Sequence, residues 1–248
     1  TTTPIERSTM KPTIVLVHGA FAESSSWNDV IDSLLGGGYP VVAAANPLRG
    51  IASDSAALSD LVRSISGPVV LVGHSYGGAV ITNVDREAGD VRALVYVAGF
   101  ASDAGESAAD LSGRVPGGTL GPTLQFVDLG EGGRDMYIAQ DKYHQQFCAD
   151  LPEEQARQMA VGQRPCTEAA LSDPSGADPL WKDIPSWFIY GELDRNIPAG
   201  SHAFMAERAG SRRTLAVTGA SHVVGMTHHE ETAEMILEAA RSTELVDA

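Results

Sequence analysis

The residues of this chain with the clearest chemical potential lie at 69–78, where the sequence reads Val-Val-Leu-Val-Gly-His-Ser-Tyr-Gly-Gly. An apolar, β-branched run ends in Gly-X-Ser-X-Gly, and a run of small residues over 77–88 then predicts a helix. A serine on so sharp a turn adopts a rare backbone conformation that pushes its hydroxyl out at the carboxyl end of the strand. Close approach within the turn requires Gly73 and Gly77. Ser75 is therefore the predicted nucleophile.

A serine hydroxyl is a poor nucleophile near neutral pH, so it needs a base to take its proton and an acid to orient that base. His222 is the predicted base, because it alone among the seven histidines lies on a Gly- and Ser-containing loop after the last predicted strand. We expect His18 to hold the geometry of a loop and His74 to point away from the nucleophile. His144 lies in an inserted segment and His202 in a predicted helix, whereas His228 and His229 open the last helix.

The orienting acid must lie at the same edge of the sheet and stay ionised. Asp194 is the predicted acid, because it follows the preceding strand in the sequence Gly-Glu-Leu-Asp. Glu192 and Asp103 are the alternatives, and Glu192 also fits a structural role as partner of a loop amide or of Arg195.

Acyl transfer requires two preorganised donors for the oxyanion of the tetrahedral intermediate. One predicted donor is the backbone N–H of Tyr76, directly after the nucleophile. The second is the N–H of Ala20 in the loop after the first strand, with Phe21 as the runner-up. The alternative for His18-Gly19 is a plain turn that ends the strand.

Strands and helices alternate along most of the chain, and this order predicts an α/β fold. Apolar runs predict strands at 13–17, 41–45, 69–72, 91–98, 187–190 and 214–217. Apolar residues at three-and-four spacing or small-residue runs predict helices at 28–35, 54–64, 77–88, 201–209 and 232–241. Strands that are apolar throughout indicate a mainly parallel sheet, covered by helices on both faces. All strand carboxyl ends then meet at one edge.

The alternation stops after Gly99 and resumes at Trp187, although one crossover needs only about a dozen residues. Residues 102–133 are rich in Gly, Ser and Asp and predict a loop, whereas 135–149 and 152–161 predict helices. We therefore expect a core formed by 1–100 and 184–248, with a small helical cap at 101–183 inserted before the acid-bearing strand. The alternative is a helical pair on the surface, remote from the site.

Composition excludes several classes of function. The net charge of −15 argues against nucleic acid or an anionic membrane as partner, and no apolar run is long enough to span a bilayer. The run His228-His229-Glu230-Glu231 is an alternative metal site, but acidic residues in the first turn of a helix are expected from its dipole. No His-Glu-x-x-His, P-loop or Gly-x-Gly-x-x-Gly motif occurs, so no cofactor is expected. Cys148 and Cys166 either pair or stay reduced. Residues 1–10 predict a polar arm, and we expect a cytoplasmic protein, with secretion as the alternative because the chain begins at Thr1.

These motifs together resemble the α/β-hydrolase superfamily, within it the branch of plant methyl esterases, hydroxynitrile lyases and related bacterial carboxylesterases. The matching segments are Val15-Leu16-Val17-His18-Gly19-Ala20, Val72-Gly73-His74-Ser75-Tyr76-Gly77-Gly78, Gly191-Glu192-Leu193-Asp194 and Ser221-His222. The resemblance implies a sheet of about six strands and the triad of Ser75, Asp194 and His222.

The expected function is that of a carboxylesterase-type serine hydrolase acting through an acyl-enzyme. The expected partner is a small-to-medium neutral ester, because an acidic surface repels anions at low salt, and the protein is expected to be a monomer or homodimer. A hydroxynitrile lyase is an alternative on the same triad, disfavoured because such lyases carry threonine where this chain has Gly19 and favoured by Lys142 in the cap. A cofactor-free haloperoxidase and a non-catalytic ligand-binding protein are further alternatives.

Overall fold

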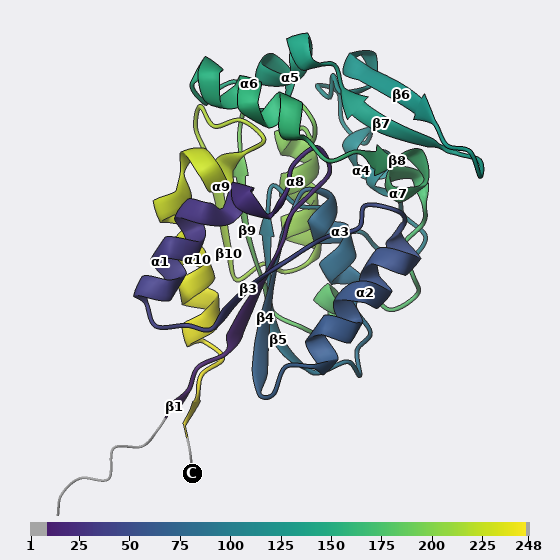
Figure 1. Ribbon diagram of the computed structural model, residues 1–248. Coiled ribbons are helices and arrows are strands. Elements are labelled where there is room, and N and C mark those ends of the chain that lie inside the picture. Colours follow the sequence, from purple (N-terminus) through teal and green to yellow (C-terminus); the bar gives the residue numbers. More distant parts are fainter. Residues whose placement is uncertain (1–8, 247–248) are drawn as a thin grey trace, which may run out of the picture.

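The computed structural model describes residues 9–246. A sheet of six parallel strands forms the centre of the protein (Figure 1). The strand order is β10-β9-β5-β4-β2-β3. The strands are β2 (Thr13–Val17), β3 (Val41–Ala44), β4 (Pro68–His74), β5 (Asp90–Val97), β9 (Ser186–Gly191) and β10 (Arg213–Val217). The prediction of a mainly parallel sheet with about six strands is confirmed.

The central strands are buried on both sides, which explains why they read as continuous apolar runs. Every residue of β4 is buried. Alternate side chains enter different clusters, with Val69 and Leu71 on one face of the sheet and Val70 and Val72 on the other. The two faces therefore need separate layers of helices.

Helices cover both faces of the sheet, as predicted (Figure 1). One face packs against α1 (Asn28–Gly36), the short α9 (Val224–Thr227) and α10 (His229–Arg241), with the 3₁₀ turn η1 (Ser24–Trp27) leading into α1. The other packs against α2 (Ile51–Arg63), α3 (Tyr76–Thr82) and α8 (Ala199–Arg208).

Two helix boundaries differ from the sequence prediction. Helix α2 starts at Ile51, earlier than expected, because the Asp54 carboxylate accepts the backbone N–H groups of Arg49 and Gly50 and so closes the first turn. Helix α3 ends at Thr82 and not at residue 88. Directly after this end, the Asn83 side-chain amide turns back and donates to the Ala79 carbonyl.

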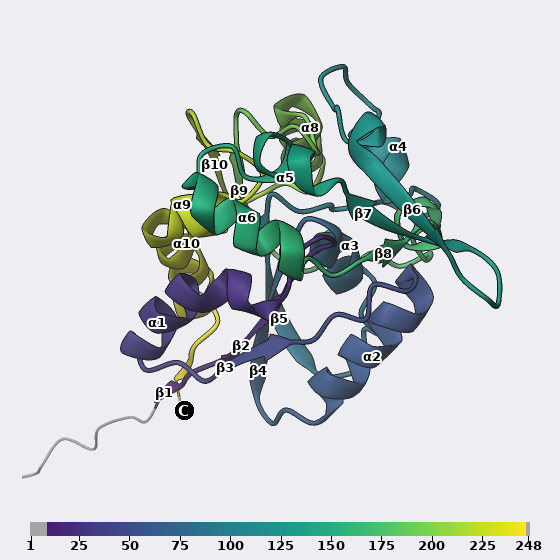
Figure 2. The ribbon, with the colours of Figure 1, turned by 45° about the horizontal axis from the view of Figure 1, so that its top comes forward.

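The segment between β5 and β9 lies across the carboxyl end of the sheet (Figures 1 and 2). Its elements are α4 (Ala108–Ser112), η2 (Gly121–Thr123), β6 (Leu124–Asp128), β7 (Arg134–Ile138), α5 (Gln140–Phe147), α6 (Glu153–Gly162), β8 (Cys166–Thr167), α7 (Glu168–Ser172) and η3 (Leu180–Lys182). Strands β6, β7 and β8 form an antiparallel sheet.

This small sheet corrects two predictions. The helix expected from residue 135 is wrong over 135–138, which belong to β7. The glycine-rich stretch expected to be loop contains the hairpin that joins β6 to β7, in which Gly132 and Gly133 adopt positive φ angles of 95° and 83°. The glycines predict the turn of the hairpin, but the sequence does not predict its two strands.

The described chain begins and ends in a two-stranded ribbon, in which β1 (Thr9–Met10) pairs antiparallel with β11 (Leu245–Val246). Most of the predicted polar arm, residues 1–8, lies outside the described residues. Within residues 9–246 no helix combines the length and apolar character that crossing a bilayer requires.

Candidate active site

Ser75 sits on the sharp turn between β4 and α3, with φ 52° and ψ −122°, a conformation that costs energy for a residue with a Cβ. A Cβ on Gly73 would lie 2.5 Å from the Gly77 carbonyl oxygen, and one on Gly77 would meet the Val17 carbonyl. The turn is held by the Ser75 carbonyl, which accepts the N–H groups of Gly78 (2.9 Å) and Phe100 (3.1 Å). The backbone geometry expected of a nucleophile turn is present.

His222 and Asp194 meet at the same edge of the sheet, in the loops that follow β10 and β9. The His222 Nδ1–H donates to Asp194 Oδ2 at 2.7 Å, and both side chains are fully buried. A Cβ on Gly191 would collide with the carbonyls of Ala220 and Ser221, so glycine there allows the two loops to pack together. His222 Nε2 is buried and has no hydrogen-bond partner among the described residues. It thus keeps a free lone pair.

Asp194 is surrounded by donors on both oxygens. Oδ1 accepts the backbone N–H groups of Asn196 and Ile197, each at 2.9 Å, and Oδ2 accepts His222 Nδ1–H and also His202 Nε2–H at 3.0 Å. Burial alone would raise the pKa of Asp194, but the charge of His222 and the hydrogen bonds from both histidines outweigh it and hold that pKa well below its usual range. The acid is therefore an ionised carboxylate.

His74, predicted only to point away from the nucleophile, packs against His222. Its Nε2–H donates to the backbone carbonyl of His222 at 3.0 Å, and the two rings lie 4.9 Å apart between centroids. Burial, followed by the charge of His222, lowers the pKa of His74 to about 3. His74 is thus a neutral donor that supports the backbone of the predicted base.

The loop after β2 distinguishes between the two candidate oxyanion donors. The Phe21 N–H is already used, since it donates to the Arg164 carbonyl at 3.0 Å. This leaves Ala20 as the better candidate. His18 holds the loop as expected, with Nδ1–H donating to the Gly19 carbonyl (2.9 Å) and Nε2 accepting the backbone N–H of Asn46 (3.1 Å). Burial lowers the pKa of His18, consistent with a neutral ring.

Comparison with known proteins supports the same fold. The model of the "Alpha/beta hydrolase family" matches residues 14–235. The chain belongs to this family. The prediction made from its motifs is confirmed.

Two curated relatives are similar to this α/β hydrolase. A carbendazim-hydrolysing esterase of Nocardioides sp. (strain SG-4G) is 35% identical over 106 residues, which are 38% of this chain and only 44% of that protein. A probable hydrolase, R7, of Phoma sp. (strain ATCC 20986 / MF5453) is 27% identical over 249 residues, covering 93% of this chain and 98% of that protein.

Solved structures share the fold at low identity. Polyneuridine aldehyde esterase superposes with a TM-score of 0.77 and 18% identity, covering 92% of this chain and 99% of that one. The methylesterase MES16 of Arabidopsis gives a TM-score of 0.75 and 14% identity, over 93% and 99% of the two chains. The expected likeness to the plant methyl esterases is thus seen in the fold.

The two alternative acids of this α/β hydrolase lie elsewhere. Glu192 is exposed, and Asp103 forms an ion pair with Lys182 at 2.6 Å. Among residues 9–246 no group of three or more His, Cys, Asp or Glu side chains is arranged to hold a metal ion. Cys148 and Cys166 are free thiols in the structure. Burial raises the pKa of Cys148 to about 12 and also raises the pKa of Cys166.

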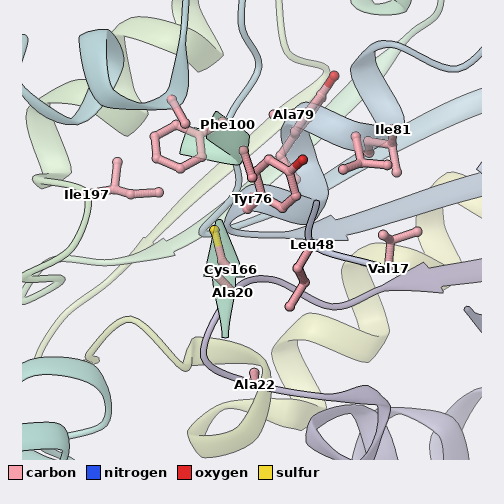
Figure 3. Close-up of a cluster of buried hydrophobic side chains, with 14 of the residues drawn as sticks. Val17, Ala20, Ala22, Leu48, Tyr76, Ala79, Ile81, Phe100, Cys166 and Ile197 are labelled. Atoms are coloured by element: carbon pink, nitrogen blue, oxygen red, sulfur yellow. The ribbon is translucent and has the colours of Figure 1, made fainter. Parts of the chain in front are cut away.

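Part of the inserted segment contacts the candidate site. Phe147 of α5 packs its ring edge-on against His222 (5.2 Å between centroids) and against His74 (6.3 Å). The Asp150 carboxylate, in the loop after α5, accepts the Ser221 N–H at 3.1 Å. One buried cluster joins Cys166 of the insertion to residues of the core: Ala20, Tyr76, Phe100 and Ile197 (Figure 3).

Sequence reasoning missed His202 and Phe147. The helical pattern around His202 predicts no catalytic role for it, yet it bonds to the acid from the first turn of α8. A histidine soon after the acid, in a helix that begins directly behind it, was the available indication. Phe147 carried no such indication, because only the folded cap shows which aromatic residue reaches His222.

Proposed function

We propose that the protein is a serine carboxylesterase that hydrolyses small-to-medium neutral esters through an acyl-enzyme. The observation that carries this proposal is the buried His222, with Nδ1–H bound to the ionised Asp194 and Nε2 unbonded. Ser75 projects from a strained turn that ends at the same sheet edge. A base held in one tautomer, at the same sheet edge as a serine on such a turn, fits the arrangement that activates a hydroxyl.

In the proposed reaction Ser75 Oγ attacks the ester carbonyl carbon while His222 Nε2 takes the hydroxyl proton. Asp194 holds the Nδ1–H tautomer and stabilises the imidazolium that forms. The N–H groups of Ala20 and Tyr76 bind the oxyanion of the tetrahedral intermediate. His222 then gives its proton to the leaving alcohol, and water attacks the acyl-Ser75 ester by the same relay to release the acid.

The names of the relatives support ester hydrolysis as the reaction class. One curated relative is an esterase and the other a probable hydrolase. We also propose that 101–183 acts as the cap that shapes the substrate pocket between core segments 1–100 and 184–248, since Phe147 already closes over His222.

Two contacts weigh against a hydroxynitrile lyase. A Cβ at Gly19 would lie 2.7 Å from Ser75 Cβ, which leaves no room for the threonine of those lyases without a shift of the nucleophile. Lys142, the cap lysine considered for that reaction, is exposed and donates to the Pro122 carbonyl at 3.3 Å. The carboxylesterase remains the function the geometry supports best.

Hydrolysis of p-nitrophenyl acetate and butyrate by wild type, Ser75→Ala and Ser64→Ala tests the proposal. Ser64 is a matched control, an exposed serine at the end of α2 whose hydroxyl donates to the Leu61 carbonyl. We expect Ser75→Ala to lose kcat by about 10⁴–10⁶-fold and Ser64→Ala to retain full activity. Covalent labelling of Ser75 by a fluorophosphonate should be lost in the same variant. Equal turnover by wild type and Ser75→Ala would overturn the proposal.

A further inference from the structure

A second histidine is bound to the acid of the proposed triad. His202 lies in the first turn of α8, is only 1% exposed, and stacks on the Tyr190 ring at 4.8 Å between centroids and 17° between planes. Its Nε2 lies 3.0 Å from Asp194 Oδ2, the oxygen that also accepts His222 Nδ1–H. The proposed reaction gives this histidine no role.

The protonation state of His202 follows from its surroundings. Asp194 is ionised and can only accept, so His202 Nε2 carries the hydrogen. Its Nδ1 is buried with no hydrogen-bond partner among the described residues, so a second proton there would leave a buried N–H group unpaired. Burial accordingly lowers the pKa of His202. The ring is a neutral donor, and the negative charge of Asp194 stays available to His222.

We propose that His202 is a positioning residue that fixes Asp194 Oδ2 and keeps the carboxylate ionised while His222 gains and loses its proton. This inference rests on the proposed serine hydrolase. The two backbone N–H groups of Asn196 and Ile197 hold Oδ1, and His202 holds Oδ2 independently of His222. The carboxylate therefore cannot rotate when the bond to His222 changes length or charge during the reaction.

The charged and titratable groups packed around His222 are few. Asp194 faces its Nδ1, His74 lies against its ring from the end of β4, His202 stands across Asp194 on α8, and Asp150 binds the neighbouring Ser221 N–H. Of these groups, His202 alone is an uncharged donor to the acid. Without its hydrogen bond, the pKa of Asp194 should rise, and the Asp194–His222 pair should take up its proton at higher pH.

A pair of substitutions separates the hydrogen bond from packing. His202→Phe keeps a ring to stack on Tyr190 and removes the donor. His202→Gln removes the ring and places an amide nitrogen near the Nε2 position. We expect His202→Phe to lower kcat by about 10- to 100-fold, the effect of one charge-assisted hydrogen bond, with KM little changed. The acid limb of its kcat/KM profile should move to higher pH, whereas His202→Gln should keep the wild-type profile.

A readout without turnover keeps this inference distinct from the proposed function. In the inactive Ser75→Ala protein, the low-field NMR signal of the His222 Nδ1 proton can be followed as a function of pH, and its assignment is checked by its loss in His222→Ala. Adding His202→Phe to Ser75→Ala should move the pH at which this signal changes to a higher value. Adding His202→Gln should leave that pH unchanged. If wild type fails to hydrolyse esters but this shift appears, the function is wrong and the positioning role stands. If His202→Phe does not fold, His202→Asn serves, because its shorter amide does not reach Asp194.

Three results would overturn the positioning role. The first is an acid limb and an NMR titration that stay unchanged in folded His202→Phe. The second is a loss in His202→Gln equal to that in His202→Phe, since restoring a donor near the Nε2 position would then have no benefit. The third is a rise in KM alone, because a residue that acts through Asp194 affects the chemical step.

Discussion

His74 should make the protein sensitive to mild acid. The ring is buried, and burial together with the charge of His222 lowers the pKa of His74 from the ordinary 6.5 to about 3. In the unfolded chain the same ring is free to bind a proton near its ordinary pKa. Between these two values the unfolded state therefore holds more protons, so the free energy of unfolding must fall as the pH falls.

The size of this loss follows from the shift. Each pH unit below 6.5 costs about 1.4 kcal/mol for one such group, so pH 5 costs about 2 kcal/mol and pH 7 almost nothing. His18 and His202, whose pKa values burial also lowers, change stability in the same direction. Asp194 also loses its contribution as the pH falls, but the pKa of this carboxyl is depressed, so that loss comes only in stronger acid.

His74→Gln isolates this contribution, since its amide can donate to the His222 carbonyl in place of Nε2 but does not titrate. Urea unfolding followed by tryptophan fluorescence should be measured for both proteins at pH 8, 7, 6 and 5. The difference in unfolding free energy between wild type and variant should stay constant from pH 8 to 7. It should then move by about 2 kcal/mol in favour of the variant at pH 5. Parallel curves down to pH 5 would refute the assignment of a neutral, buried His74.

Two further substitutions test the architecture around the nucleophile. Gly19→Ala should lower kcat/KM at least ~100-fold, because its Cβ would lie 2.7 Å from Ser75 Cβ. The control Gly36→Ala, at the end of α1, should leave activity unchanged, because nothing lies within 4 Å of the added Cβ. Equal activities of the two variants would contradict the steric argument. Asp54→Asn should lower the unfolding free energy by about 2–3 kcal/mol in urea titrations. The reason is that the buried Asp54 carboxylate accepts hydrogen bonds from the Tyr76 hydroxyl, at 2.7 Å, and from two backbone N–H groups. A loss below about 0.5 kcal/mol would mean that the amide of asparagine replaces the carboxylate in these hydrogen bonds.

The sequence predicts the central sheet well because strands that are buried on both faces consist of uninterrupted apolar residues. Val70 and Val72 enter one cluster while Val69 and Leu71 enter the other, so the strand has no polar side and stands out as an apolar run. Strand β6 leaves no such trace. Four of its five residues are exposed and Leu124 alone is half-buried, and the stability of β6 comes from pairing with β7. Pairing of this kind is a tertiary property that composition does not report.

The site divides in the same way. Ser75, Asp194 and His222 could be proposed because each follows a strand, and parallel strands bring their carboxyl ends to one edge. His202 and His74 could not, because their roles depend on the direction in which a helix or a turn faces. Pro198, the N-cap residue of α8, lies only four residues after Asp194, so the first turn of the helix places His202 close to the carboxylate.

The two histidines on Asp194 also show why only one of them is suited to act as the base. His222 binds the carboxylate through Nδ1, the nitrogen next to its own backbone, and this leaves the far nitrogen Nε2 free at the end of the ring. His202 binds through Nε2 and keeps its free nitrogen next to its own helix, where it cannot extend to a substrate or a serine. His18 uses both nitrogens on backbone groups. The choice of ring nitrogen, set by which loop or helix carries the histidine, therefore decides which ring can move a proton and which can only hold the acid in place.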